Sequence, residues 1–484
     1  MTSFLRVAAV VVATSSALAG AGVQRQAPAA QPKQTAFDRY VAAADPNFSW
    51  KVARELPADG VTATLLEMTS QQWLTDKEVE KPLWTHWITV VRPAEVTSDV
   101  ALLFISGGSN DRQPPARPSQ WLVDAARETG TVTAELRLVP NQPVVFTDDP
   151  ARTPRSEDDF IAYTWDKYLR TGDEKWPARL PMTKSAVRAM DTVTAFAAGA
   201  AGGAKRVGRF VVSGASKRGW TAWTTAATDH RVITVAPAVI DMLNIEPSFE
   251  HHWRAYGAWS DAVNDYVRHG IMDWLGTPQF RALMRIEEPY EYRERLTMPK
   301  FILNASGDQF FLPDSSRFYF DELKGEKLLR YIPNTSHSLE KSDALESLQA
   351  FYASIVKGTP RPRFTWTFER DGSIKVVTKD LPDRVQLWQA LNPAARNFRD
   401  DVIGPAYRGT PLIASGPNTY VATVPAPPAG WTAFFVELTF ASGGRYPLKA
   451  TTAVRVLPET LPFAAPARRQ PATGDASRPQ PLHY

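Results

Sequence analysis

Short apolar runs alternate with longer segments of helical pattern between residues 98 and 356. SDVALLFISGG (98–108) is typical of a buried strand, and PSQWLVDAARETG (118–130) is typical of the helix after it, ended by Gly130 as a C-cap. Repeated strand–helix–strand units of this kind predict a parallel sheet and an α/β fold. The other strands are expected at VTATLLEMTS (61–70), THWITVVRP (85–93), TVTAELRLVP, RVGRFVVSG, RVITVAPAVID, PKFILNASGD and KLLRYIPN, and the other helices at KRGWTAWTTAATD and over residues 184–200, 315–323 and 339–356.

Two segments interrupt this alternation. Residues 141–181 are rich in proline, charge and tryptophan, and residues 244–298 are mostly helical in pattern. Both segments leave the sheet at its C-terminal edge, where ligands bind in open α/β folds. They are therefore predicted to form a helical lid.

The pattern changes after residue 360. Short alternating runs such as FTWTFER, SIKVVTK and WTAFFVELTF are separated by turn residues. Such runs predict a small all-β, sandwich-like domain over residues 361–458.

The first residues have the pattern of a secretory signal peptide. Arg6 stands before VAAVVVATSSALAG, which is too short and too rich in alanine to span a membrane comfortably, and Ala17-Leu18-Ala19 fits a cleavage site. An uncleaved membrane anchor is the alternative. We expect a periplasmic or secreted protein that is cleaved near Ala19 and makes no stable membrane insertion afterwards. The chain has no cysteine, so disulfides play no part.

Charge and motifs give no sign of nucleic acid, metal or cofactor. The formal net charge of +4 comes from 55 basic and 51 acidic residues, which are spread along the chain without basic blocks. There is no H-E-x-x-H motif, and the adjacent His251 and His252 would face different directions on a helix. We therefore expect none of these three partners.

The run FVVSGASKRGW places Ser216 where a strand turns into a helix. A serine hydroxyl is a poor nucleophile unless a base removes its proton, and catalytic serines often stand on a strained G-x-S-x-G elbow. Gly214 keeps the first glycine of that motif, but Arg218 occupies the second position and the glycine is displaced to Gly219. A serine in an ordinary glycine-rich turn is the alternative.

Two later strand ends carry the partners that a serine nucleophile needs. Asp308 follows FILNASG and His337 follows YIPNTS, so Ser216, Asp308 and His337 come in the chain order of α/β-hydrolases. Asp308 taken singly is consistent with a turn former, and His337 with a loop histidine; Asp314 and Asp241 are the reserve acids. The agreement of three strand-end positions favours a Ser-His-Asp triad.

Backbone N–H groups must also receive the developing oxyanion. We expect the N–H of Lys217, the residue after the nucleophile, and one N–H from the loop Ser106-Gly107-Gly108. Glycine lets the backbone approach a substrate closely, and either Gly107 or Gly108 could donate. A plain turn is the alternative for this loop.

Substrate-binding residues are marked less clearly. Lys217 and Arg218 either attract an anionic substrate group or pair with acids. Arg218, Trp220 and Trp253 are weak candidates for substrate contact. The tryptophans of the two insertions either wall the site or pack in the core of the lid: Trp165, Trp176, Trp253, Trp259 and Trp274.

Several longer stretches also resemble a known family. They are FISGGSND, LVPNQPVVF, EDDFIAYTWDKYL, LPMTKSAVRAMDTV, VSGASKRGWTAWTTAATDHRV, PAVIDMLN, NASGDQFFLPDSS and NTSHSL, and they span residues 100–340. Together they resemble the PhoPQ-activated pathogenicity-related protein family, an exported group of α/β-hydrolase type. The resemblance implies this fold, with the nucleophile at Ser216 and Asp308 and His337 completing the triad. The elbow alone is also similar to that of glucuronoyl esterases.

These predictions combine into one organisation and one main function. We expect an exported serine hydrolase that acts on carboxylic esters through an acyl-enzyme. One alternative is a serine peptidase or aminopeptidase, in which Asp148, Asp149 and residues 157–159 hold a peptide amine; another is a non-catalytic secreted binding or signalling protein. The predicted parts are a signal peptide (1–19), a disordered leader (20–36), an α/β-hydrolase domain (37–360) with its two lid insertions, a β-rich domain (361–458) and a disordered tail (459–484).

Overall fold

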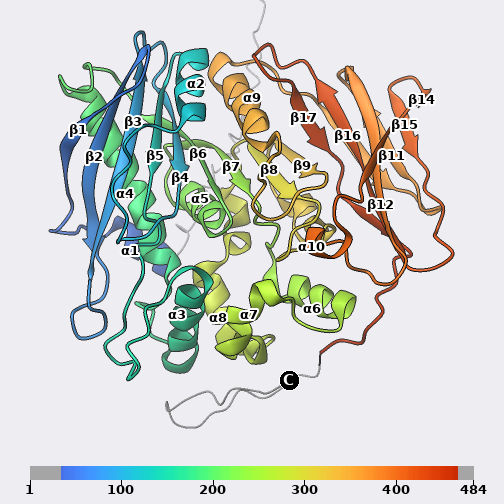
Figure 1. Cartoon of the computed structure of the whole chain (residues 1–484), viewed down its shortest axis with the longest axis horizontal. Coiled ribbons are helices and arrows are strands. Elements are labelled where there is room, and N and C mark those ends of the chain that lie inside the picture. The colour runs from blue at the N-terminus through green and yellow to red at the C-terminus, as the bar shows by residue number, and fades with distance from the viewer. Residues whose placement is uncertain (1–33, 467–484) are drawn as a thin grey trace, which may run out of the picture. The chain divides into compact units, whose positions relative to one another are not determined.

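A nine-stranded sheet forms the centre of this computed structural model, which describes residues 34–466 (Figure 1). Its strand order is β1-β2-β3-β5-β4-β6-β7-β8-β9. The strands from β5 to β9 pair in parallel, whereas β1, β2, β3 and β5 pair in antiparallel fashion. Their bounds are β1 Ser49–Leu56, β2 Val61–Gln72, β3 Leu83–Pro93, β4 Val100–Ile105, β5 Val132–Leu136, β6 Arg209–Ala215, β7 Val232–Ala238, β8 Lys300–Ala305 and β9 Lys327–Ile332.

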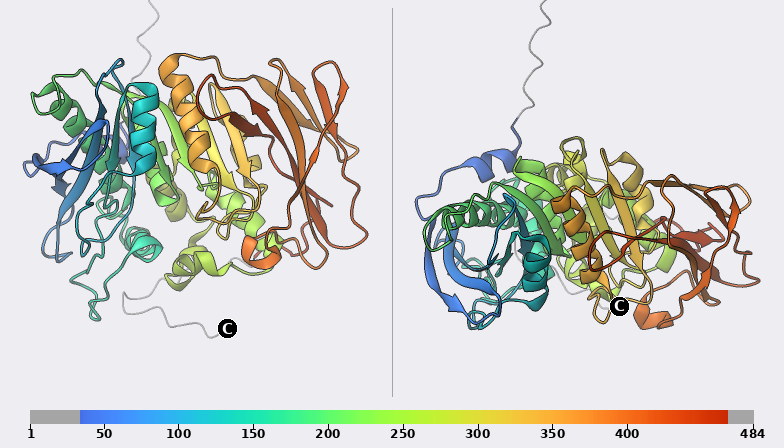
Figure 2. Two further views of the ribbon diagram at one scale, coloured as in Figure 1. Left: turned by 45° about the horizontal axis from the view of Figure 1, so that its top comes forward. Right: turned by 90° about the horizontal axis from the view of Figure 1, so that it is seen from above.

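Helices cover both faces of this sheet (Figure 2). Leu102 of β4 packs with helices α2 (Gln120–Thr129) and α9 (Ala344–Lys357), while its neighbour Leu103 packs with α4 (Arg179–Ala198) and α5 (Lys217–Thr228). Successive side chains of a strand point to opposite faces, so a strand that is covered on both sides must be apolar throughout. The α/β-hydrolase fold predicted from the sequence is confirmed.

The two insertions form a helical layer beyond the carboxyl ends of the strands, along the lower edge of Figure 1. The first contributes α3 (Glu157–Thr171), and the second contributes α6 (Ile245–Tyr256), α7 (Asn264–Arg268) and α8 (Pro278–Glu287). Helix α3 packs against α7 and α8, so the two insertions support each other.

A small helix α1 (Ala36–Ala42) precedes the sheet, and several short 3-10 turns join the larger elements. Two of these turns, Ser315–Phe318 and Phe320–Glu322, replace the single helix expected there. Asp314, which precedes the first of these turns, makes no capping hydrogen bond and pairs with Arg396.

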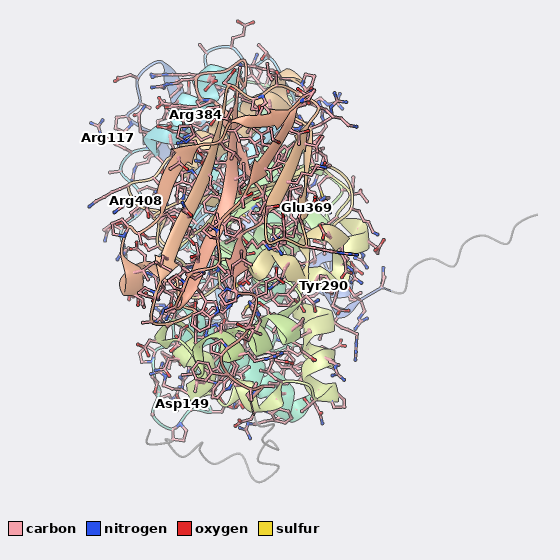
Figure 3. The ribbon with its side chains drawn as sticks, turned by 90° about the vertical axis from the view of Figure 1, so that its right-hand side faces the viewer. Arg117, Asp149, Tyr290, Glu369, Arg384 and Arg408 are labelled. Carbon is pink, nitrogen blue, oxygen red and sulfur yellow. The ribbon has the colours of Figure 1, made fainter. Side chains whose placement is uncertain are left out.

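The carboxyl-terminal part consists of two antiparallel sheets, with strand orders β10-β11-β15-β14 and β13-β12-β16-β17 and with β18 beside β16. Apolar side chains from both sheets share one core, as in a sandwich. Figure 3 views the molecule from this side, with the exposed Arg384 on strand β12 and the exposed Arg408 on strand β13. The bounds are β10 Phe364–Phe368, β11 Ile374–Thr378, β12 Arg384–Asn392, α10 Asp400–Ile403, β13 Arg408–Pro411, β14 Ala414–Gly416, β15 Thr419–Ala422, β16 Trp431–Phe440, β17 Leu448–Thr451 and β18 Arg455–Leu457.

From Thr35 onward the described residues form one compact unit. The predicted signal peptide and most of the predicted leader and tail lie outside the described residues. Of the predicted tail, Thr460 accepts a hydrogen bond from Trp431, and Phe463 donates one to Arg254. Within residues 34–466, no helix is long and apolar enough to cross a membrane.

Candidate active site

Ser216 is the single residue between strand β6 and helix α5. Its φ of 54° and ψ of −128° are strained for a serine, because the side chain of a residue with positive φ crowds the backbone. The strain is held in place by two hydrogen bonds: the Ser216 N–H donates to the Ala238 carbonyl at 2.8 Å, and its carbonyl accepts from the Trp220 N–H at 3.0 Å. A turn this sharp sets the serine at the tip of the strand.

The two glycines of the elbow allow the strand and the helix to touch. A Cβ on Gly214 would lie 2.6 Å from the Arg218 carbonyl oxygen, and one on Gly219 would lie 2.9 Å from the Gly214 oxygen and 3.0 Å from the Ala238 oxygen. Real Cβ atoms do not approach backbone so closely. Gly219 therefore serves the packing that the second glycine of the usual motif serves.

His337 and Asp308 lie together at the ends of β9 and β8. The Nδ1 atom of His337 lies 3.0 and 2.9 Å from the two carboxylate oxygens of Asp308, which is itself buried. The Asp308 carboxylate also accepts from the Phe310 N–H at 2.8 Å. A carboxylate at Nδ1 keeps the proton there and leaves Nε2 free to accept one.

The two reserve acids are engaged elsewhere. Asp314 pairs with His251 at 3.0 Å and with Arg396 at 2.7 Å, and Asp241 accepts from the hydroxyls of Tyr319 at 2.6 Å and Tyr331 at 2.5 Å. Burial raises the pKa of Asp241 to about 7. Burial acts in the same direction on Asp314, but Arg396 and His251 outweigh it and hold the pKa of Asp314 well below its usual range.

A pocket brings the serine and the histidine regions together. Ser216 lines it, and so do Phe310 and Phe311, whose rings lie 4.4 and 5.9 Å from the His337 ring. Its empty space, including the open mouth, is about 450 Å³. Both insertions, the elbow and the segment after β7 supply the rest of its walls: Asp158, Trp165, Arg179, Lys217, Trp220, Ile240, Met242, Ile245, Phe249, Val263 and Tyr266.

The predicted oxyanion donors are only partly brought to this pocket. Lys217 lines it, and its N–H, in the first turn of α5, has no acceptor within the described residues. The register of β4 and β6 pairs Ile105 with Gly214, which sets Gly107 level with the serine. However, Gly107 and Gly108 line a separate pocket that shares no residue with the first.

The two cations of the elbow are paired with acids of the first insertion. Lys217 Nζ lies 2.9 Å from Glu157 and 3.0 Å from Asp158, and the Arg218 guanidinium makes two hydrogen bonds to Glu157 at 2.7 and 2.6 Å. Burial alone would raise the pKa of the Glu157 carboxyl, but Arg218 and Lys217 outweigh burial and hold it well below its usual range. Of the two expectations for these cations, pairing with acids is the one observed.

Sequence reasoning missed this role for Glu157 and Asp158. Their acidic run at the start of α3 is also what a helix amino terminus prefers, so it carried no sign of distant partners. It also missed Arg179, a pocket residue whose guanidinium is buried against Glu287 at 3.4 Å.

The tryptophans divide between the pocket and the lid core. Trp220 lines the pocket and donates from Nε1 to the Glu287 carbonyl at 2.6 Å. Of the five tryptophans expected in the lid, only Trp165 lines the pocket. Trp253 instead packs against Trp259 at 5.1 Å between ring centroids.

Within the part of the chain that the structure describes, no three histidine or acidic side chains are grouped to hold a metal ion. His251 contacts Asp314, and His252 accepts from the Ser260 N–H at 3.1 Å.

Comparison with known proteins identifies the family. The sequence profile of the PhoPQ-activated pathogenicity-related proteins matches residues 37–399. The chain belongs to this family. Autocrine proliferation repressor protein A of Dictyostelium discoideum is 36% identical over 477 residues, which cover 92% of this chain and 94% of that protein.

Solved structures with a similar arrangement include two esterases. Acetyl xylan esterase 1 from Thermoanaerobacterium sp. has a TM-score of 0.47 and 12% identity. The match covers 66% of the present chain and 92% of the esterase chain. Glucuronoyl esterase from Solibacter usitatus has a TM-score of 0.39 and 13% identity, over 66% of this chain and 91% of that chain.

Proposed function

We propose that this member of the PhoPQ-activated pathogenicity-related family is an exported serine hydrolase that cleaves carboxylic esters. The observation that carries the proposal is the His337–Asp308 hydrogen bond at the sheet edge that also presents Ser216 on a strained turn. Export would be read from the mass of the mature protein, which should begin after Ala19.

The proposed reaction uses Ser216, His337 and Asp308 in turn. The Oγ of Ser216 attacks the ester carbonyl while Nε2 of His337 takes the hydroxyl proton, and Asp308 stabilises the imidazolium that forms. The Lys217 N–H, and the loop after β4 if it closes toward the serine, would donate to the oxyanion. The alcohol leaves with the proton from His337, and water then cleaves the acyl-enzyme by the same steps.

The state of the acidic residues favours esters over peptides. An aminopeptidase needs an unpaired carboxylate to hold the peptide amine, but each acid expected in that role already has a cationic partner. These pairs are Asp148 with Lys167, Asp149 with Arg155, Glu157 with Lys217 and Arg218, Asp158 with Lys217, and Asp159 with Arg155 and His269.

A second function is favoured by one observation, the name of the 36%-identical relative. That relative is named as a repressor of proliferation, so a secreted signalling protein that keeps the hydrolase fold without catalysis is the competing proposal.

Labelling with a fluorophosphonate probe separates the two proposals. We expect labelling of the wild type, and none of Ser216→Ala. The matched control is Ser213→Ala, which removes a buried hydroxyl from strand β6, three residues before Ser216, and should be labelled at the wild-type rate. Folded wild-type protein that takes up no probe would favour the signalling proposal.

Esters and amides are then compared as substrates of wild-type enzyme that has not been exposed to the probe. We expect turnover of 4-nitrophenyl butyrate and none of alanine 4-nitroanilide. Faster cleavage of the anilide would favour the peptidase alternative.

A further inference from the structure

The charges around the serine pocket are balanced in pairs. Arg179, one of the two cations that line the pocket, is matched by the buried Glu287. The other, Lys217, is held by Glu157 and Asp158. The remaining walls are almost entirely apolar or aromatic.

Asp158 completes this balance. Glu157 cannot neutralise Lys217 by itself, because both of its oxygens also accept from Arg218. Asp158 lines the pocket, and its Oδ2 lies 3.0 Å from Lys217 Nζ while its Oδ1 accepts from the Tyr266 hydroxyl at 3.1 Å. The two cations of the elbow and the two carboxylates therefore sum to zero.

We propose that Asp158 is a specificity-determining residue that neutralises Lys217 and so restricts this pocket to uncharged, apolar acyl groups. This inference rests on ester hydrolysis at Ser216. A carboxylate on the acyl chain would lose its hydration in the pocket, would find no free cation in the described wall, and would be repelled by Asp158. An apolar chain gains from the same desolvation.

Removal of the charge on Asp158 should change this preference. In Asp158→Asn the amide keeps its size, but Lys217 and Arg218 then share the single carboxylate of Glu157. One uncompensated positive charge remains beside the serine, where the apolar walls screen it poorly. An anionic acyl chain then gains a partner that it lacks in the wild type.

The test compares 4-nitrophenyl hexanoate with 4-nitrophenyl hydrogen adipate, whose six-carbon acyl chains differ by one terminal carboxylate. The measured quantity is the ratio of their kcat/KM values, in which any loss of folded enzyme cancels. We expect the wild type to prefer hexanoate by at least 100-fold and Asp158→Asn to reduce that preference at least 10-fold.

Two further variants control this result. Asp159→Asn makes the same change at the next residue, whose partners are Arg155 and His269, and should leave the ratio within 2-fold of the wild type. Lys217→Met leaves Asp158 without its cation, and should increase the preference for hexanoate. The double variant Asp158→Asn with Lys217→Met should return the ratio toward that of the wild type.

Two results with an active wild-type enzyme would overturn the inference. One is a kcat/KM ratio that does not change in Asp158→Asn. The other is an equal change of that ratio in Asp159→Asn. If Asp158→Asn does not fold, an unchanged ratio in Lys217→Met would overturn it. A wild type that hydrolyses neither ester and takes up no phosphonate would instead overturn the proposed function.

Discussion

Arg218 occupies the position where a serine elbow usually has glycine, and its side chain acts as a brace. Its Nε donates to the Val139 carbonyl at 2.5 Å, and its terminal nitrogens bind Glu157. Glu157 is in turn fixed by Gln142, which accepts from its N–H at 2.8 Å and donates to the Gly108 carbonyl at 3.0 Å. The first insertion, the loop after β4 and the elbow are thus joined through one carboxylate.

We expect Glu157→Gln to slow the chemical step. The amide cannot neutralise Lys217 and Arg218, so the elbow should lose its fixed position. We expect kcat to fall about 10-fold or more with little change in KM. The reason is that a misplaced donor weakens the stabilisation of the transition state rather than the binding of substrate. Steady-state kinetics on 4-nitrophenyl butyrate and the rate of phosphonate labelling measure this. Asp166→Asn, which breaks a pair with Arg170 on the same helix, should leave both rates unchanged. A rise in KM alone would contradict the bracing role.

Among the elements, the segment after strand β7 carries a buried carboxyl that pairs with no cation within residues 34–466. Asp241 is 2% exposed, and hydroxyls of Tyr319 and of Tyr331 on β9 donate to it. Because burial raises the pKa of Asp241 from 3.8 to about 7, the folded protein keeps a proton that the unfolded chain loses near pH 4.

This difference predicts a fall in stability between about pH 4 and pH 7. Below pH 4 both states hold the proton; as pH rises the unfolded chain ionises first, so the free energy of unfolding decreases until the folded carboxyl also ionises. The Asp241→Asn variant should not show that decrease. At pH 8 its free energy of unfolding should exceed that of the wild type by up to about 4 kcal/mol. Urea midpoints at pH 5 and pH 8 measure it. Parallel pH dependence of the two proteins would show that Asp241 is not the group responsible.

At the scale of the whole molecule, a buried ion cluster ties the sandwich to the sheet and the lid. Arg396 of the β-rich part and Asp314 after β8 are 1% and 2% exposed, and His251 of helix α6 completes the cluster. Asn334 after β9 adds hydrogen bonds to Tyr407 of the sandwich at 2.8 and 3.0 Å.

Loss of one member should therefore affect the whole molecule. We expect Arg396→Met to lower the free energy of unfolding by about 3–5 kcal/mol, because Asp314 loses a partner in a buried site. The matched substitution Arg363→Met breaks an exposed pair with Asp380, whose side chains are 69% and 41% exposed, and should lower the free energy of unfolding far less, because water screens an exposed pair. Urea titration of both variants provides the measurement; equal losses would argue against the cluster as a tie.

The local sequence pattern predicted most of the fold and identified the three residues of the candidate triad. Strands β4, β6, β8 and β9 were predictable because a strand covered on both faces is a continuous apolar run, and Ser216, Asp308 and His337 follow three of these runs directly. Strand β1 was missed because most of its residues are exposed, which leaves no apolar alternation to detect.

Local sequence pattern was enough to predict the α/β-hydrolase sheet, the helical insertions, the sandwich and the strand ends that carry the candidate triad. The packing between elements sets which acid contacts His337 and how Lys217 and Arg218 are neutralised, and it joins the sandwich and the sheet in one unit. The reason is physical: periodicity records which face of an element is buried, whereas an ion pair such as Glu157–Arg218 joins residues 61 positions apart. Only the packing of separate elements brings such partners together.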